Sequence, residues 1–100
     1  MRIMGIDYGD ARTGLAVSDE MNILVGEAWT LNEWNPERVA DVIAQEAQKR
    51  NVRRLVLGLP KNMDGSEGPR AEKCRDFAEL LRSKTDIELV MWDERRSSIE

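Results

Sequence analysis

The chain contains a short and almost uninterrupted apolar run, Leu-Val-Leu-Gly-Leu, at residues 55–59. It lies between two segments whose apolar residues recur at helical spacing, at residues 36–50 and 69–83. A run of this kind is typical of a strand buried on both faces of a sheet. Because a strand–helix–strand unit normally gives a parallel crossover, these segments predict an α/β fold.

The segments on either side of this unit are also strand-like. Residues 2–7, 13–18 and 23–31 are separated by short connections, which predicts an antiparallel meander. Residues 87–92 form a further apolar run, and residues 93–100 are expected to begin another helix. We therefore expect one domain over residues 1–100, with a mixed five-stranded sheet in the order β-β-β-α-β-α-β, flanked by helices.

Side-chain composition limits the chemistry that the chain can perform. It has no histidine, which excludes Ser-His and Cys-His nucleophiles and His-ligated zinc. Catalysis by Asp and Glu usually needs a hard divalent cation such as magnesium. The single cysteine, Cys74, excludes an intramolecular disulfide, and its place in an apolar helix stripe predicts a core residue rather than a reactive thiol.

Charge and hydropathy bear on partners and location. The net charge of −4 argues mildly against a large nucleic-acid footprint, although metal ions and a few local basic residues could still create a phosphate site. No apolar run is long enough to cross a bilayer, and the first residues lack the features of a signal peptide. We expect a cytoplasmic protein with no membrane partner.

Three acidic residues follow predicted strands. Asp7 ends the first strand, and Asp93 and Glu94 follow the last one. Sites in open α/β sheets form at the carboxyl ends of parallel strands, so Asp7 and one of this pair should converge. Convergent carboxylates repel unless a metal lies between them, and two such ions can support phosphodiester cleavage. The alternatives are that backbone amides satisfy Asp7 and that Asp93 only caps a helix.

Basic residues are expected near the same edge. The long connection at residues 59–70 contains glycines that could present amides to a phosphate, and it carries Lys61, Asn62 and Arg70. Arg12 and Arg95 should lie beside it. A solvated turn is an equal alternative for this connection on its spacing alone.

The three tryptophans, Trp29, Trp34 and Trp92, could stack on bases. Core packing is the favoured interpretation for Trp92. Trp34 lies in a polar segment, which predicts partial exposure.

Four segments together resemble the YqgF (RuvX) family of bacterial RNase H-like proteins. They are Met-Gly-Ile-Asp-Tyr-Gly at 4–9, residues 12–18, Gly-Leu-Pro-Lys-Asn-Met-Asp-Gly at 58–65, and Trp-Asp-Glu-Arg at 92–95. Members are described as Holliday-junction resolvases and as nucleases that mature the 5′ end of pre-16S rRNA.

The resemblance implies an RNase H-like fold and a site for Mg²⁺ or Mn²⁺. Asp7 would be the first-strand carboxylate and metal ligand, and Glu94, with Asp93 beside it, the acid from the last strand. Lys61, Asn62 and Asp64 match the family loop. The implied activity is metal-dependent cleavage of structured nucleic acid, with pre-rRNA first, four-way DNA junctions second, and ribosomal particles as a further partner.

The sequence departs from the family pattern at its end. Family members usually continue into helices that carry another site Asp, whereas this sequence stops at Glu100, and Arg96 stands where an apolar residue is common. We therefore expect a C-terminally truncated domain that lacks these helices. In this form a non-catalytic nucleic-acid-binding module is the alternative to a nuclease.

A nucleotide-binding fold of the actin and sugar-kinase type is a weaker alternative. The segment at 5–9 with Thr13-Gly14 resembles the first phosphate loop of that group. The group also needs two large domains and a second phosphate motif, and this chain has neither.

Overall fold

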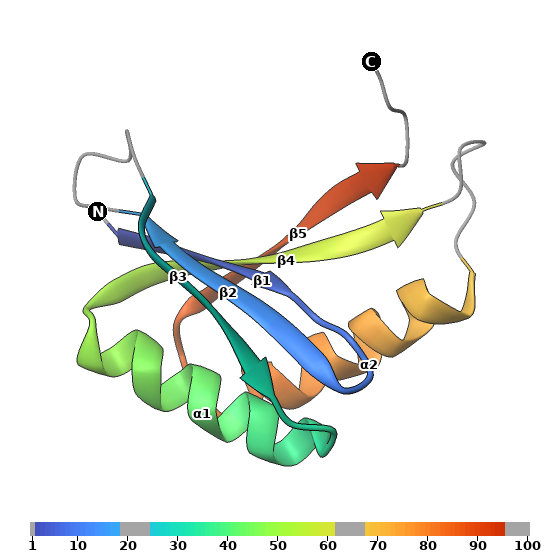
Figure 1. The fold of residues 1–100 in the computed structure, drawn as a ribbon, viewed down its shortest axis with the longest axis horizontal. Coiled ribbons are helices and arrows are strands. Elements are labelled where there is room, and N and C mark those ends of the chain that lie inside the picture. The colour runs from blue at the N-terminus through green and yellow to red at the C-terminus, as the bar shows by residue number, and fades with distance from the viewer. Residues whose placement is uncertain (1, 19–24, 62–67, 96–100) are drawn as a thin grey trace.

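In the part of the chain that the structure describes, five strands form one mixed sheet, and two helices pack against one of its faces (Figure 1). The computed structural model describes residues 2–18, 25–61 and 68–95. The elements are β1 (Arg2–Asp7), β2 (Arg12–Ser18), β3 (Val25–Asn32), α1 (Pro36–Lys49), β4 (Val52–Lys61), α2 (Pro69–Arg82) and β5 (Glu88–Arg95). Neither helix is long and apolar enough to cross a membrane.

The strand order is β3-β2-β1-β4-β5. β1 pairs antiparallel with β2 and parallel with β4, so that Ile6 lies between Leu15 and Leu57. β5 continues the sheet parallel to β4. The predicted mixed sheet is confirmed, and β1, β4 and β5 end at the same edge.

Local signals account for where the helices begin. The side chain of Asn35 accepts a hydrogen bond from the backbone N–H of Glu37 at 3.0 Å, and Pro36 occupies the first turn of α1, as predicted. α2 begins at Pro69 after Gly68. Asn51 has a positive φ of 58° directly after α1, which turns the chain into β4.

The core lies between the sheet and the two helices. Alternate residues of the strands face the helices, among them Met4, Leu15 and Leu57, and α1 and α2 contribute Ile43 and Phe77. Cys74 is buried in a smaller cluster with Leu59 and Ala71, which confirms the core assignment for this cysteine.

The other face of the sheet carries small residues. Within the described ranges both helices lie on the opposite side, so no helix covers this face (Figure 1). Gly5, Gly14 and Ala16 lie on it, and Trp92 of β5 is 62% exposed there. The prediction that Trp92 packs in the core is therefore wrong. Its register opposite Gly58 assigns it to the open face.

β4 and β5 run further than predicted, and the reason is their mutual pairing. Asp93 pairs with Leu59 and Glu94 with Pro60, so these acids lie in β5 and do not begin a helix. The rest of the expected helix falls at residues 96–100, outside the described residues. Pro60 is tolerated because it lies beyond the last β1–β4 pair, where β4 has a strand on one side only.

Among the described residues, one buried hydroxyl has no partner. Thr13 is fully buried, and its Oγ1 makes no hydrogen bond to any residue of those ranges. An unsatisfied buried hydroxyl costs stability. We expect Thr13→Val to raise the free energy of unfolding by about 1 kcal/mol, measured by chemical denaturation. Thr13→Ser, which keeps the hydroxyl and loses the methyl group, should lower it. A less stable Thr13→Val protein would show that the hydroxyl is bonded in solution.

Candidate active site

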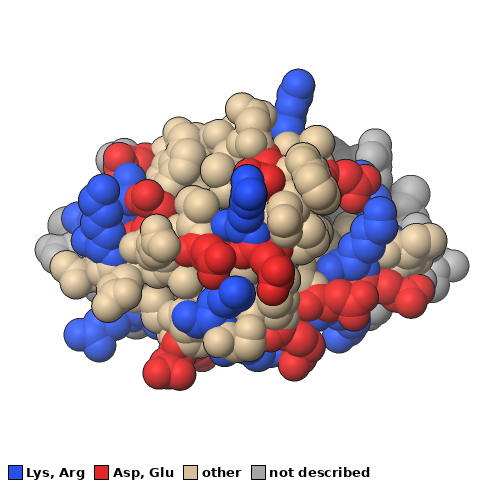
Figure 2. All heavy atoms as spheres, turned by 90° about the horizontal axis from the view of Figure 1, so that it is seen from below, with Lys and Arg blue, Asp and Glu red and all other residues tan. Residues whose placement is uncertain are grey.

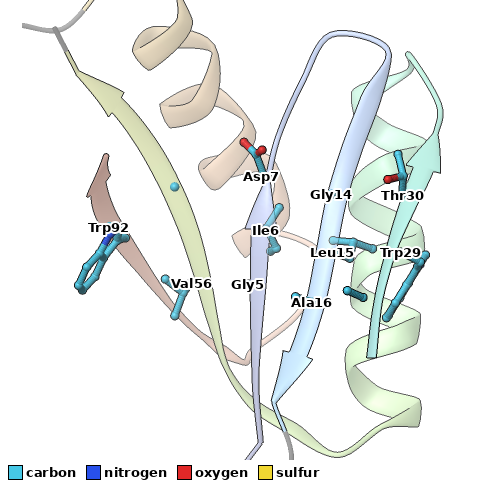
Figure 3. Close-up of a pocket in the computed structure, with 12 residues that line it drawn as sticks. Gly5, Ile6, Asp7, Gly14, Leu15, Ala16, Trp29, Thr30, Val56 and Trp92 are labelled. Atoms are coloured by element: carbon cyan, nitrogen blue, oxygen red, sulfur yellow. The ribbon is translucent and has the colours of Figure 1, made fainter. Parts of the chain in front are cut away.

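Asp7 is the last residue of β1, and its carboxylate points onto the open face (Figure 3). It is exposed and has no hydrogen-bond or ion-pair partner within the described ranges. Its partner in β2 is Gly14, where an added Cβ would lie 3.6 Å from the Asp7 Cβ. Because Gly14 has no side chain, nothing from β2 covers the carboxylate.

A shallow hollow of about 510 Å³ extends from Asp7 across the open face. Its floor consists of Gly5, Gly14, Gly58 and neighbouring backbone, and Trp92 lies on the far side of β4 (Figure 3). Sequence reasoning missed the role of these glycines. The signal was available, since glycine inside a strand often marks a place where a ligand approaches the backbone closely.

The two acids of β5 are placed by their backbone. Trp92 lies opposite Gly58, and Glu94 is two residues further along β5. Residues two apart in a strand belong to the same face, so Glu94 shares the parity of Trp92, and Asp93 has the opposite parity. The side chains of Asp93 and Glu94 lie outside the described part, and convergence of Glu94 with Asp7 stays a prediction.

Among the side chains that the structure describes, no group of three potential ligands is close enough to hold a metal ion. Asp7 nevertheless fits one ligand of a hard divalent cation, because it is a solvent-accessible carboxylate with no internal partner in that part of the chain. Glu94 is the residue of β5 whose position could supply a second.

The predicted phosphate-binding residues are only partly placed. Arg12 begins β2, directly after the turn that follows Asp7, and Arg70 lies in the first turn of α2. Both are exposed, and neither has an ion-pair partner in the described ranges. The side chains of Lys61 and Arg95, at the ends of β4 and β5, and all of Asn62 and Asp64 lie outside the described residues.

Tyr8, beside Asp7, faces the helices. Its ring stacks on Phe77 of α2, with centroids 4.1 Å apart and an interplanar angle of 10°. Burial, followed by the negative charges of Asp10 and Cys74, raises the pKa of the Tyr8 phenol above its ordinary value of 10.0. The Asp7–Tyr8 peptide therefore joins the open face to the core at the carboxyl edge.

The turn between β1 and β2 requires glycine at position 9. A Cβ there would lie 2.4 Å from the Arg12 carbonyl oxygen, which is backbone and cannot move aside alone. We expect Gly9→Ala to lower the free energy of unfolding by about 2 kcal/mol, measured by denaturation. Gly5→Ala is the matched control, because its nearest atom would be 3.9 Å away. Equal effects of the two substitutions would contradict the steric explanation.

The raised pKa of Tyr8 gives a pH dependence with a defined sign. The folded protein holds the phenol proton more tightly than the unfolded chain, so this stability is complete below pH 10 and is lost as the pH rises through the folded-state pKa. From about pH 9 to about pH 11, unfolding free energy should fall more steeply in the unsubstituted protein than in Tyr8→Phe.

The ionisation itself can be followed by ultraviolet absorbance, because Tyr8 is the chain's only tyrosine. A titration midpoint at or below that of a free tyrosine would contradict the burial.

Comparison with known proteins identifies a matching family, related sequences and solved structures of similar fold. A family model for RuvX, described as a Holliday junction resolvase, matches residues 1–100. A protein of Halothermothrix orenii named "Putative pre-16S rRNA nuclease" is 45% identical over 100 residues, which cover all of this chain and 71% of that protein. A Bacillus mycoides protein of the same name is 45% identical over 101 residues, covering 99% and 74%.

Among solved structures, Thermus thermophilus RuvC in complex with a Holliday junction substrate superposes with a TM-score of 0.68 at 11% identity. The match covers 93% of this chain and 64% of that one. At this identity the likeness concerns the fold alone. It confirms the predicted RNase H-like fold.

Proposed function

Because this chain belongs to the RuvX family, we propose that it is a cytoplasmic nuclease that cleaves phosphodiester bonds in structured nucleic acid with the help of Mg²⁺ or Mn²⁺. The observation that carries the proposal is the exposed carboxylate of Asp7, which has no partner among the described residues and lies at the end of a central strand on a face lined by glycine. A carboxylate in this setting is available to bind a cation and a phosphate together.

The proposed roles follow from position. Asp7 binds the metal from β1, and Glu94 binds it from β5, with Asp93 as its neighbour. When bound, the metal ion would polarise the phosphodiester and lower the pKa of an attacking water. Gly14 and Gly58 keep the approach open for the sugar–phosphate backbone.

The basic residues would position the substrate. Arg12 follows the turn after Asp7, and Arg70 begins α2, so both can contact phosphates next to the scissile bond. Lys61, Asn62 and Arg95 are proposed to add contacts at the ends of β4 and β5. These contacts would fix the register of the nucleic acid without reading its sequence.

Pre-16S rRNA is the proposed substrate. The two relatives described above, which are named for this RNA, are 45% identical to the chain, and the chain covers 71% and 74% of their length. An rRNA precursor within a ribosomal particle would present the structured RNA. Four-way DNA junctions are the second candidate, which the description of the matching family favours.

The decisive experiment measures cleavage of labelled 5′-extended pre-16S RNA, with a four-way DNA junction in parallel, across Mg²⁺ and Mn²⁺ concentrations. We expect metal-dependent cleavage of the RNA. Asp7→Asn should lower the rate by at least about a hundredfold, because it removes the charge that holds the metal. Asp86→Asn, the same change at an exposed position before β5, is the matched control and should leave the rate unchanged.

Each outcome has a distinct meaning. Cleavage of the junction but not the RNA would move the chain to the second candidate substrate. Cleavage that survives Asp7→Asn would refute the assigned metal ligand. Binding of RNA without cleavage at any metal concentration would refute a nuclease activity of this chain and leave a binding module.

A further inference from the structure

A second hollow lies at the same edge of the sheet, on the side of the helices. It has a volume of about 370 Å³, within the range of sites for small ligands. Residues from three segments line it: the turn after β1, the start of α1, and α2. They are Tyr8, Asp10, Trp34, Pro36, Lys73, Asp76, Phe77 and Leu80.

The exposed side chain of Trp34 forms one wall of this hollow. The side chain is 74% exposed, and within the described ranges it stacks on no other ring. The neighbouring ring of Tyr8 is already stacked on Phe77 and is not free in the same way. An exposed indole next to a cavity is a ready platform for a flat ligand, because stacking needs only a π-face.

The polar groups of the hollow favour a ligand that donates hydrogen bonds. Lys73 Nζ lies 3.2 Å from Asp10 Oδ1, so these two charges neutralise each other. Asp76 is exposed and has no ion-pair partner among the described residues. The hollow thus offers an aromatic face and one uncompensated carboxylate, which accepts hydrogen bonds and repels phosphate.

These features fit a nucleobase better than they fit a phosphate. Guanine presents two adjacent N–H donors on its Watson–Crick edge, and a carboxylate can accept both in a bidentate pair. Uracil presents only one donor there, flanked by acceptors. A cationic protein side chain could also meet Trp34 and Asp76, and the test below distinguishes it from a nucleobase.

The position of the hollow connects it with Asp7. Asp7 and Tyr8 are consecutive, and strand alternation sends them to opposite faces at one edge. A nucleic-acid strand whose phosphate lies at Asp7 could turn an unpaired base around this edge. The hollow would then hold a nucleotide next to the one being cleaved.

We propose that this hollow binds an unpaired guanine of the substrate, stacked on Trp34 and recognised by Asp76. The proposal rests on the proposed nuclease function for its biological setting. It makes the enzyme selective for structured nucleic acid in which a guanine near the scissile phosphate is unpaired.

Binding can be tested without cleavage by titrating the ¹⁵N-labelled chain with GMP. The chain has three tryptophans, so its spectrum shows three indole N–H signals, which single Trp→Phe substitutions assign. We expect the Trp34 signal to shift in a saturable manner, while the Trp29 and Trp92 signals report separately on nucleotide contact with the open-face hollow. UMP, which carries the same ribose and phosphate, should bind at least about fivefold more weakly.

Two substitutions separate stacking from base recognition. Trp34→Ala should weaken GMP binding about tenfold, followed through the backbone amides of Tyr8 and Asp76, whereas Trp34→Phe should retain most of it. Asp76→Asn should remove the preference for GMP over UMP, and Asp86→Asn should preserve it. A preserved amide spectrum in each variant confirms that the fold is intact.

The result that overturns the proposal is an unshifted Trp34 signal at high GMP, or equal responses to GMP and UMP. A response to free arginine with none to GMP would assign the hollow to a cationic ligand instead. Asp7→Asn should respond to GMP as the unsubstituted chain does. If the unsubstituted chain responds to GMP but cleaves no substrate, only the proposed nuclease function is rejected, whereas cleavage without a GMP response rejects only this pocket.

Discussion

The pairing of β1 on both sides determines the arrangement of everything else. β1 is antiparallel to β2 and parallel to β4, so the chain returns at once on one side and must cross over through a helix on the other. The crossover brings the ends of β4 and β5 to the edge where β1 stops. Asp7 occupies that edge because it is the residue at which β1 ends, and the tight approach of Gly9 to the Arg12 carbonyl holds the turn beside it.

The two faces of the sheet differ because the strands alternate large and small residues. Met4 and Ile6 pack toward the helices, while Gly5 between them faces outward, and in β2 Leu15 alternates with Gly14 and Ala16 in the same way. The helix side thereby obtains the apolar contacts that stabilise the domain. The backbone of the open side is accessible because the residues there are small, so a bulky nucleic acid can approach it. The same alternation separates Asp7 from Tyr8 and so gives one edge two hollows of different chemistry.

Local patterns predicted the elements and their order, because helix periodicity, the Asn35 cap and the apolar run of β4 are features of short stretches of sequence. The expectation that β4 is buried on both faces is wrong, since Val56 and Gly58 line the hollow on the open face. Tertiary pairing decided the rest. The length of β5 depends on β4 as its partner, and the exposure of Trp92 depends on which face the helices cover, so neither followed from residues near them. The placement of Arg50 over the Trp29 ring, 4.6 Å from its centroid, joins positions that no local pattern connects. The acids of the proposed site could be identified in the sequence, whereas the position of Gly14 beside Asp7 depends on how the strands align.

An acidic chain that acts on nucleic acid must gather its available basic residues where the substrate binds. Several cations of the described part are engaged internally, since Arg54 pairs with Glu88 at 3.2 Å and Lys84 with Asp41 at 3.1 Å. The helical face accordingly shows both charges intermixed, with no basic stripe along which a phosphate backbone could run (Figure 2). Arg12 and Arg70 are different, because they have no such partner in those ranges; Arg12 begins β2 after the turn that follows Asp7, and Arg70 lies in the first turn of α2. Affinity for nucleic acid grows with the number of phosphates that basic residues neutralise. Few basic residues are available for this in the described ranges, because several are paired internally. In the proposed function, recognition therefore comes from the local fit of a folded substrate to the carboxyl edge. There a metal ion and an unpaired base would supply the attraction that a chain with a net charge of −4 lacks.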